Sequence, residues 1–307
     1  VEAVNEIDGT AFLMVHEVSG AKLLFLQNED VDKSFSITFK TPAADDTGVF
    51  HILEHSVLCG SERFPVKEPF VNLLKGSMQT FLNAMTFPDK TMYPVASTNM
   101  TDLMNLTDVY MDAVFHPNIY HNQNIFKQEG WHLEAVRAEL SQVASEGEAA
   151  ELRPEEAAIP TTSDPSDVRL AYNGVVYNEM KGALSEPESI LYDTLSAALF
   201  PDTTYRFESG GTPAAIPDLT YEAFLDAHER HYRADNAYII LYGAVDAARM
   251  LSFLDEGYLS KMPAAPEGAP VNPLVLQEPV VKMDARREMV TAPDNACLAL
   301  GYVVGTS

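Results

Sequence analysis

The stretch HILEH at residues 51–55 constrains the fold of this chain more than any other feature of its sequence. It places two of the chain's 8 histidines four residues apart, with a glutamate directly before the second. In an α-helix, which turns by about 100° per residue, His51, Glu54 and His55 fall on one face, and the two imidazoles lie one turn apart. The stretch therefore predicts a helix that presents two imidazoles and a carboxylate on one side.

Strand-like patterns precede this helix. They are AFLMVHEV (11–18), AKLLFLQN (21–28) and SFSITFKT (34–41). The turn dipeptide Ser19-Gly20 lies between the first two and predicts a hairpin, while the alternation of the third predicts another strand. Asp46 or Thr47 is placed to cap the helix, and Gly60 is placed to end it.

Helices and strands are also expected along the rest of the chain. Helical patterns cover residues 66–76, 100–115, 125–140, 173–184, 188–200, the second half of 212–232, and a last segment that ends near Leu259. Strand patterns cover 80–87 and 90–97, joined at Pro88-Asp89, and 236–245. The acidic, Pro/Ala-rich residues 141–167 are expected to be a mobile surface insertion.

The domain organisation follows from a proline-rich stretch near the end of the chain. Residues 1–260 are expected to form the catalytic domain, and 261–279 to form a linker. Residues 280–307 are then the start of a truncated second domain, with a strand at NACLALGYVVG (295–305).

Composition excludes several classes of protein. A net charge of −25 argues against nucleic acid as a partner, because phosphate binding needs clustered Lys and Arg. No run of 18 apolar residues is present, so no membrane association is expected. Two cysteines and no secretory signal at the N-terminus indicate an intracellular protein, either cytoplasmic in a bacterium or in an organelle matrix after removal of a transit peptide.

The HILEH helix can hold a metal ion. Two histidines bind through ring nitrogens, and a zinc site that keeps one position open for water needs a third protein ligand. Glu54 can then accept the proton of the water as a general base. The order H-x-x-E-H is the reverse of H-E-x-x-H and is typical of inverted zinc peptidases. The alternatives are a surface helix with two unconnected histidines, or a core histidine bonded to the backbone.

Further segments carry a family resemblance. They are GVFHILEHSVLCGS, FLNAMTFPDKTMYPV, IFKQEGWHLE, GVVYNEMKGAL and SGGTPAAIPDLTYEAF, in this order. Together they closely resemble the N-terminal part of the presequence protease branch of the M16 (pitrilysin-like) metallopeptidases, over most of residues 8–260. The resemblance implies an α+β fold, with a mainly antiparallel sheet covered on one side by helices.

The resemblance also implies the metal ligands. One Zn²⁺ per chain would be held by His51, His55 and Glu179, and Glu54 would be the base. In the insulysin-like branch a second glutamate lies two helical turns before the third ligand, but here that position is Tyr172. The carboxylate that orients a histidine must come from elsewhere.

Two glutamates are candidates for that carboxylate, Glu129 and Glu134. Four other side chains have less support as functional residues. His228 and His231 are three positions apart on one helix and could bind a metal, but no third ligand is evident, which favours a surface helix. His116 is expected to contact the last carbonyls of its helix. Cys59, one turn past His55, could approach the rim of the site, although a small buried apolar role is the simpler interpretation.

FLNAM (81–85) resembles the strand of the family that accepts a peptide along an exposed sheet edge. Such backbone pairing is largely indifferent to the peptide's sequence. Asn83 could hold a peptide group of the substrate, and Ala84 could contribute through its backbone. Without the resemblance, Asn83 reads equally well as a turn or bulge residue.

The predicted function is a zinc endopeptidase that degrades short unstructured peptides. Family members enclose the peptide between two halves, so a C-terminal half, or a pairing subunit, is an expected partner. The alternative function is a non-catalytic peptide-binding or assembly half, since some M16 proteins act in that way. Retention of His51, Glu54, His55 and Glu179 favours the enzyme.

Overall fold

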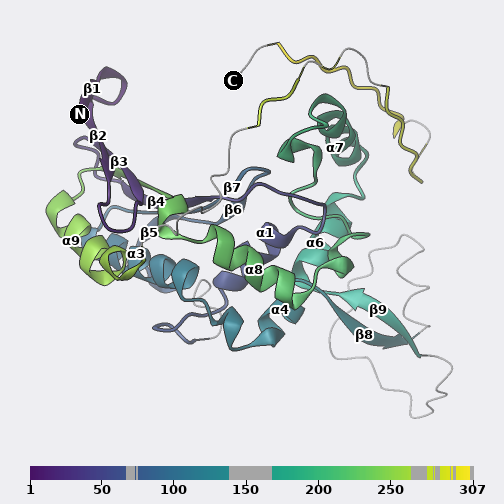
Figure 1. Cartoon of the computed structure of the whole chain (residues 1–307), viewed down its shortest axis with the longest axis horizontal. Helices are drawn as coiled ribbons and strands as arrows, with labels where there is room; N and C mark the ends of the chain where they lie inside the picture. The colour runs from purple at the N-terminus through teal and green to yellow at the C-terminus, as the bar shows by residue number, and fades with distance from the viewer. Residues whose placement is uncertain are drawn as a thin grey trace.

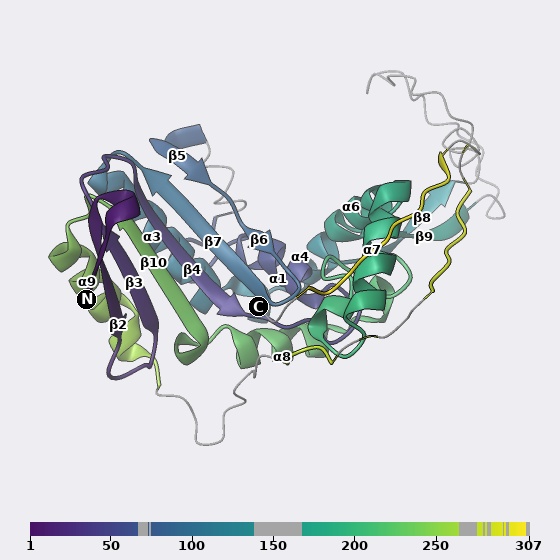
Figure 2. The ribbon, with the colours of Figure 1, turned by 90° about the horizontal axis from the view of Figure 1, so that it is seen from above.

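The computed structural model describes residues 1–66, 73, 75–137, 168–263, 275–278, 280, 284–290, 292 and 295–304. Its centre is a twisted sheet, seen nearly edge-on in Figure 1 and from above in Figure 2. The strands are β1 (Glu2–Val4), β2 (Gly9–Val15), β3 (Lys22–Gln27), β4 (Lys33–Lys40), β5 (Gln79–Leu82), β6 (Met85–Thr86), β7 (Lys90–Ser97) and β10 (Ala237–Gly243).

The order of strands in this sheet is β1-β2-β3-β10-β4-β7-β5, with β6 also paired to β7. All of these pairings are antiparallel except that of β10 with β3. The predicted hairpin is β2–β3, and the predicted third strand is β4. However, β10 lies between β3 and β4, so the end of the domain completes a sheet begun at its start.

Helices cover one face of the sheet. Those on that side are α1 (Val49–Val57), α3 (Met100–Phe115), α4 (Gln123–Glu129), α8 (Tyr221–His231) and α9 (Ala247–Gly257), whereas α6 (Val175–Ala183) and α7 (Pro187–Leu199) lie beyond the end of the sheet (Figure 2). Both views place α3 and α9 on the same side of the sheet. Alternate residues of β4, namely Phe35, Ile37 and Phe39, are fully buried on that side, as expected for a half-buried strand. The predicted α+β fold is confirmed.

One predicted helix, 125–140, is wrong in its second half. The helix α4 ends at Glu129, and His132–Arg137 form β8, which pairs antiparallel with β9 (Val168–Asn173). Gly130 ends α4 because the chain there lies against α1: a Cβ on Gly130 would be 3.2 Å from Ile52 Cγ2 and 2.8 Å from Phe126 O. The partner strand of β8 is distant in sequence, which a local pattern cannot reveal.

The predicted cap of α1 is also wrong. The N-cap residue is Gly48, without a side-chain cap, and neither Asp46 nor Thr47 bonds the first turn. The Asp46 carboxylate instead accepts a hydrogen bond from the backbone N–H of Glu208 at 2.9 Å, and the Asp46 backbone carbonyl accepts one from the N–H of Thr212 at 2.8 Å. The predicted end of the helix agrees better with the structure, since α1 ends at Val57, three residues before Gly60.

The C-terminal strand expected at 295–305 does not form within its described residues, 295–304. Leu298, Leu300 and Tyr302 are 75–85% exposed there, so the apolar side chains have no sheet to cover. Most of the expected helix 66–76, the insertion 141–167 and most of the linker 261–279 lie outside the described residues. No helix in the described part of the chain is long and apolar enough to cross a membrane.

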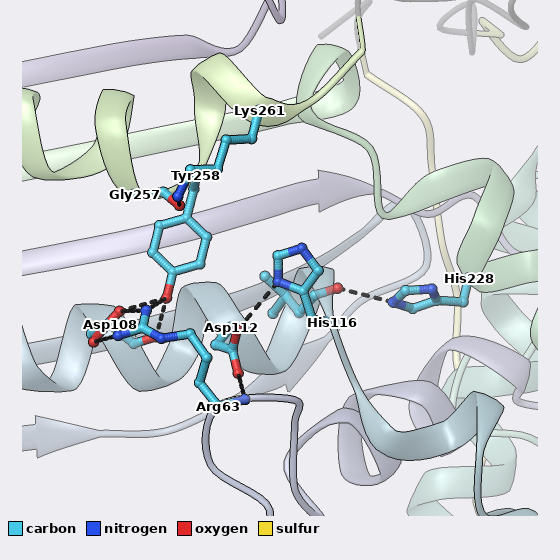
Figure 3. Close-up of polar contacts among 9 residues, drawn as sticks. Arg63, Asp108, Asp112, His116, His228, Gly257, Tyr258 and Lys261 are labelled. Carbon is cyan, nitrogen blue, oxygen red and sulfur yellow. Dashed lines mark hydrogen bonds and ion pairs between the residues drawn. The ribbon is translucent and has the colours of Figure 1, made fainter.

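A polar network fixes the loop that follows α1 (Figure 3). Arg63 makes two hydrogen bonds to the Asp108 carboxylate on α3, and Tyr258, just after α9, donates to the same carboxylate. The backbone N–H of Arg63 donates to Asp112 at 2.8 Å. His116 bonds the Asp112 side chain at 3.2 Å, and not the last carbonyls of the helix as expected. The network therefore ties α1, α3 and α9 together.

His228 is buried, so the prediction of a surface helix for His228 and His231 is wrong for the first of the two. His228 is 4% exposed, and its Nε2–H donates to Val114 O at 2.9 Å. Its Nδ1 is 2.8 Å from the Tyr120 hydroxyl, which donates to it when the ring is neutral. His231 is less buried and donates from Nδ1 to Ala227 O. Both histidines are therefore structural.

The burial of His228 predicts that stability depends on pH. Burial lowers the pKa of His228 from 6.5 to about 4, so the unfolded chain binds this proton at higher pH than the folded chain. The stabilisation is complete above about pH 6.5 and is lost as the pH falls toward 4, by on the order of 3 kcal/mol. Denaturant unfolding at about pH 7.5 and 5 should show about 2 kcal/mol of this loss, and His228→Gln should show a smaller one. Equal losses in the two proteins would contradict it.

Candidate metal centre

Two helices bring the predicted metal ligands together. On α1, His51 and His55 are one turn apart, with ring centroids 5.0 Å from each other. Glu179 lies on α6, whose buried residues Val176 and Met180 pack into the core and leave the Glu179 side chain 52% exposed. Half-burial of this glutamate is what its apolar neighbours indicate in the sequence.

The three side chains converge on one point. The Nε2 atoms of His51 and His55 are each 3.6 Å from Glu179 Oε2. One ligand atom from each residue lies within 4.8 Å of the others. At tetrahedral angles, zinc–ligand distances of roughly 2.0–2.1 Å separate neighbouring ligand atoms by about 3.3 Å. The spacing and the two-nitrogen, one-oxygen donor set therefore fit Zn²⁺.

Polar contacts at Nδ1 of each imidazole leave its Nε2 free to face the point where the three side chains converge. His51 Nδ1–H donates to Gly210 O at 3.0 Å, since a carbonyl can only accept. His55 Nδ1 is 3.5 Å from Glu129 Oε2. Of the two carboxylates expected to orient a histidine, Glu129 is therefore in place, whereas Glu134 is exposed on β8 and bonds Asn173.

Charges around His55 and Glu129 favour their ionised forms. Burial by itself lowers the pKa of His55, but the bond to Glu129 and the carboxylates of Glu54 and Glu179 raise it above its ordinary value. Burial raises the pKa of Glu129, yet the bonds from His55 and Cys59 lower it overall. Cys59 Sγ lies 3.4 Å from Glu129 Oε1, so it reaches the rim of the site and is only partly buried.

Glu54 is buried beside the two histidines and is held by a residue that the sequence reading missed. The Thr86 hydroxyl, on β6, donates to Glu54 Oε2 at 2.7 Å. Glu54 itself is 9% exposed. The only hint in the sequence is that Thr86 follows the FLNAM stretch, so a strand that is expected to carry substrate also contacts the expected base.

Asn83 and Ala84 lie between β5 and β6, at the edge of the sheet. Pairing to β7 keeps the same register on both sides of them (Leu82↔Val95 and Met85↔Met92), and the irregularity falls earlier, between Gln79 and Phe81. Asn83 is thus not a bulge residue. Its Oδ1 accepts from the Ala84 N–H at 3.0 Å.

A buried tyrosine supports this edge from beneath. The Tyr110 hydroxyl, on α3, donates to Asn83 O at 3.1 Å. Burial and the nearby charge of Glu54 raise the pKa of Tyr110, so it remains a donor at any physiological pH. The edge strand, the buried carboxylate and the imidazole pair therefore form one continuous site.

Solved structures share this fold. A protease from Helicobacter pylori superposes with a TM-score of 0.63 at 14% identity, covering 87% of this chain and 54% of that one. Pitrilysin superposes with a TM-score of 0.60 at 16% identity, covering 90% and 25%. At such identities the likeness concerns the fold alone, and the fold is that of the M16 peptidases.

Sequence relatives narrow the assignment. Protein HypA of Clostridium perfringens is 51% identical over 259 residues, and presequence protease 1 (chloroplastic/mitochondrial) of Arabidopsis thaliana is 45% identical over 265 residues. These matches cover 84% and 86% of this chain. The chain belongs to the presequence protease-like branch of the M16 family.

Two features of these matches bear on activity. The chain spans about a quarter of the length of the curated relatives, 24% of the Clostridium protein and 22% of the Arabidopsis protein. The matching family model is described as "Peptidase M16 inactive domain" and covers residues 218–307. His51, Glu54, His55 and Glu179 all lie before that segment.

The convergence of the three ligands predicts metal binding by the chain itself. One Zn²⁺ per chain is expected, and His51→Ala, His55→Ala or Glu179→Gln should each weaken it by more than the roughly 10–100-fold that loss of an outer hydrogen-bond partner costs. A two-ligand site holds zinc poorly. Chelator competition and metal analysis measure this, with the exposed His121→Ala as control. Full occupancy in Glu179→Gln would remove Glu179 from the ligand set.

Proposed function

We propose that this chain carries the metal centre and substrate edge of a zinc-dependent endopeptidase that degrades short unstructured peptides. One observation carries the proposal: a buried carboxylate, Glu54, lies on the same helical face as two imidazoles that converge with Glu179. Beside them runs a sheet edge, β5–β6, which has no further strand paired to it among the described residues.

Each residue has a distinct part in peptide hydrolysis. His51, His55 and Glu179 would hold the zinc ion, which polarises a carbonyl and makes water a better nucleophile at neutral pH. Glu54 would accept the proton of the attacking water and later deliver it to the leaving amine. Thr86 fixes one oxygen of Glu54, Oε2. The other oxygen, Oε1, accepts no hydrogen bond from the described residues and would face the water.

The substrate would add to the sheet edge as an extended strand. Asn83 N–H bonds Pro94 O on β7, so the backbone groups of Ala84 and Thr86 face the open side. A peptide paired there would run past Glu54. Asn83 and Ala84 are the proposed substrate-binding residues, and main-chain pairing suits peptides of varied sequence. The net charge of −25 favours basic peptides if part of it lines the site.

We propose that residues 1–260 are the catalytic domain, that 261–279 are a linker, and that 280–307 start a second M16-like domain. The C-terminal half, or a pairing subunit, is the proposed partner, and neither nucleic acid nor a membrane is. The curated relatives are fourfold longer or more, which supports this arrangement. Those relatives are bacterial or named for organelles, which supports a location in the bacterial cytoplasm or an organelle matrix.

A second candidate is a non-catalytic peptide-binding or assembly half. The description of the family model that matches residues 218–307 favours it. That segment contains α8, β10 and α9, and it supplies none of the four residues of the proposed centre. The two candidates differ in one property, which is whether Glu54 is needed for turnover.

Glu54→Gln separates a base from a ligand. The amide keeps the shape of the side chain but cannot accept the proton, so zinc content should stay normal. Peptidase activity of the complete two-half protein should fall at least about a hundredfold. A fluorogenic-peptide assay at matched metal content measures it, with the exposed Glu62→Gln as control. Unchanged activity in Glu54→Gln would contradict the mechanism, and no activity in any form would favour the non-catalytic half.

The 307-residue chain alone should be a poor enzyme. Turnover also needs groups around the developing oxyanion and exclusion of water, which the second half is proposed to supply. The zinc-loaded chain should cleave unstructured peptides at least about a thousandfold more slowly than a two-half form. Adding the C-terminal half in trans should restore part of the rate. Full turnover by the isolated chain would show that one domain carries the whole active site.

A further inference from the structure

The loop at residues 208–212 lies against the start of α1, about 160 residues away in sequence. Its Gly210 carbonyl accepts from His51 Nδ1–H at 3.0 Å. Two hydrogen bonds to Asp46, from the N–H groups of Glu208 and Thr212, anchor the loop on either side of Gly210. Within the loop, Glu208 Oε1 accepts from Gly210 N–H at 2.9 Å, which holds the peptide group of Gly210 in place.

This contact determines the tautomer of His51. A carbonyl oxygen has no proton to give, so the bond exists only when Nδ1 carries the hydrogen. The lone pair of the neutral ring is then at Nε2, the atom that faces Glu179 Oε2 at 3.6 Å. In the opposite tautomer, the lone pair of Nδ1 would face the lone pairs of Gly210 O. The N–H at Nε2 would then point to the place where the metal ion is proposed to bind.

The approach of the loop to α1 leaves no space for side chains. Gly48, the N-cap of α1, has φ +66°, and a Cβ there would lie 2.5 Å from Gly210 O and 2.8 Å from Gly210 C. A Cβ on Gly211 would be 2.9 Å from Gly48 Cα. These are backbone atoms, so no side-chain rotation relieves the overlap.

The same loop touches the helix of the third ligand. A Cβ on Gly210 would be 2.6 Å from the sulfur of Met180, the residue after Glu179. Met180 is 7% exposed. Gly210 is therefore wedged between the element that carries His51 and the element that carries Glu179.

We propose that the loop of residues 208–212 is a positioning element of the metal centre. It holds His51 as the Nδ1–H tautomer, with Nε2 directed at the metal, and it sets the distance between His51 and Glu179. This inference rests on the proposed function for its biological meaning. Its physical content, a tautomer and a contact, is testable in the metal-free chain.

The first test is the tautomer of His51 by two-bond ¹H–¹⁵N NMR of the metal-free chain at about pH 8.5, where unperturbed imidazoles are neutral. His51→Gln assigns the signals. We expect Nδ1 to be protonated and Nε2 not. A protonated Nε2, or a ring that averages between the two tautomers, would overturn the inference. Failure of the chain to bind zinc would instead count against the proposed function and leave this measurement valid.

The second test compares alanine substitutions at two glycines that have similar φ angles. Gly48→Ala inserts a Cβ into the loop, whereas Gly20→Ala, at φ +77°, meets only ordinary contacts at 3.5 Å with Asp235. Both bear the cost of a left-handed backbone, but only the first displaces the Gly210 carbonyl. We expect zinc affinity to fall at least about tenfold in Gly48→Ala and to stay near wild type in Gly20→Ala.

Circular dichroism shows whether both variants fold. A folded Gly48→Ala chain with wild-type zinc affinity would overturn the role of the loop. Equal losses of affinity in the two variants would also overturn it, because the effect would then be one of backbone strain in general. If Gly48→Ala does not fold, the tautomer measurement on the wild-type chain decides.

Discussion

The backbone of Gly174 lies directly on the backbone of Gly130, and the position of Glu179 depends on this contact. A Cβ on Gly174 would be 2.1 Å from Gly130 O, so no other residue fits there. Gly174 is the N-cap of α6, and Gly130 is the C-cap of α4. The contact therefore fixes the start of the helix of Glu179 against the end of the helix of Glu129, and both carboxylates reach His55 from opposite ends of its ring.

The three carboxylates of the centre differ sharply in their surroundings. Glu54 and Glu129 are buried and hydrogen-bonded, while Glu179 is half exposed. A buried carboxylate without partners would be costly, and here Thr86 and His55 supply those partners. Contacts within the protein therefore hold Glu54 and Glu129 in place, whereas Glu179 is open to solvent.

The sequence predicted those parts of the fold that depend on local pattern or on motif. The β2–β3 hairpin, α3 and the face shared by His51, Glu54 and His55 were all predictable in this way. Three features were not, because each depends on distant residues: β10 between β3 and β4, the pairing of β8 with β9, and the hydrogen bond that His51 donates to the Gly210 carbonyl. Asp46 is an example. Its residue type and position suit a helix cap, but its carboxylate accepts a hydrogen bond from Glu208, 162 residues further along the chain.

The place of β10 has a consequence for the order of events during synthesis. Ala237–Gly243 lie between β3 and β4, with one neighbour parallel and the other antiparallel. Until these residues leave the ribosome, the two N-terminal parts of the sheet have no strand to join them. Pairing between strands that are distant in sequence is slow, because the entropic cost of closing the loop comes before any stabilising contact forms. Completion of the sheet therefore waits for a strand that lies almost 200 residues after β4 in the sequence.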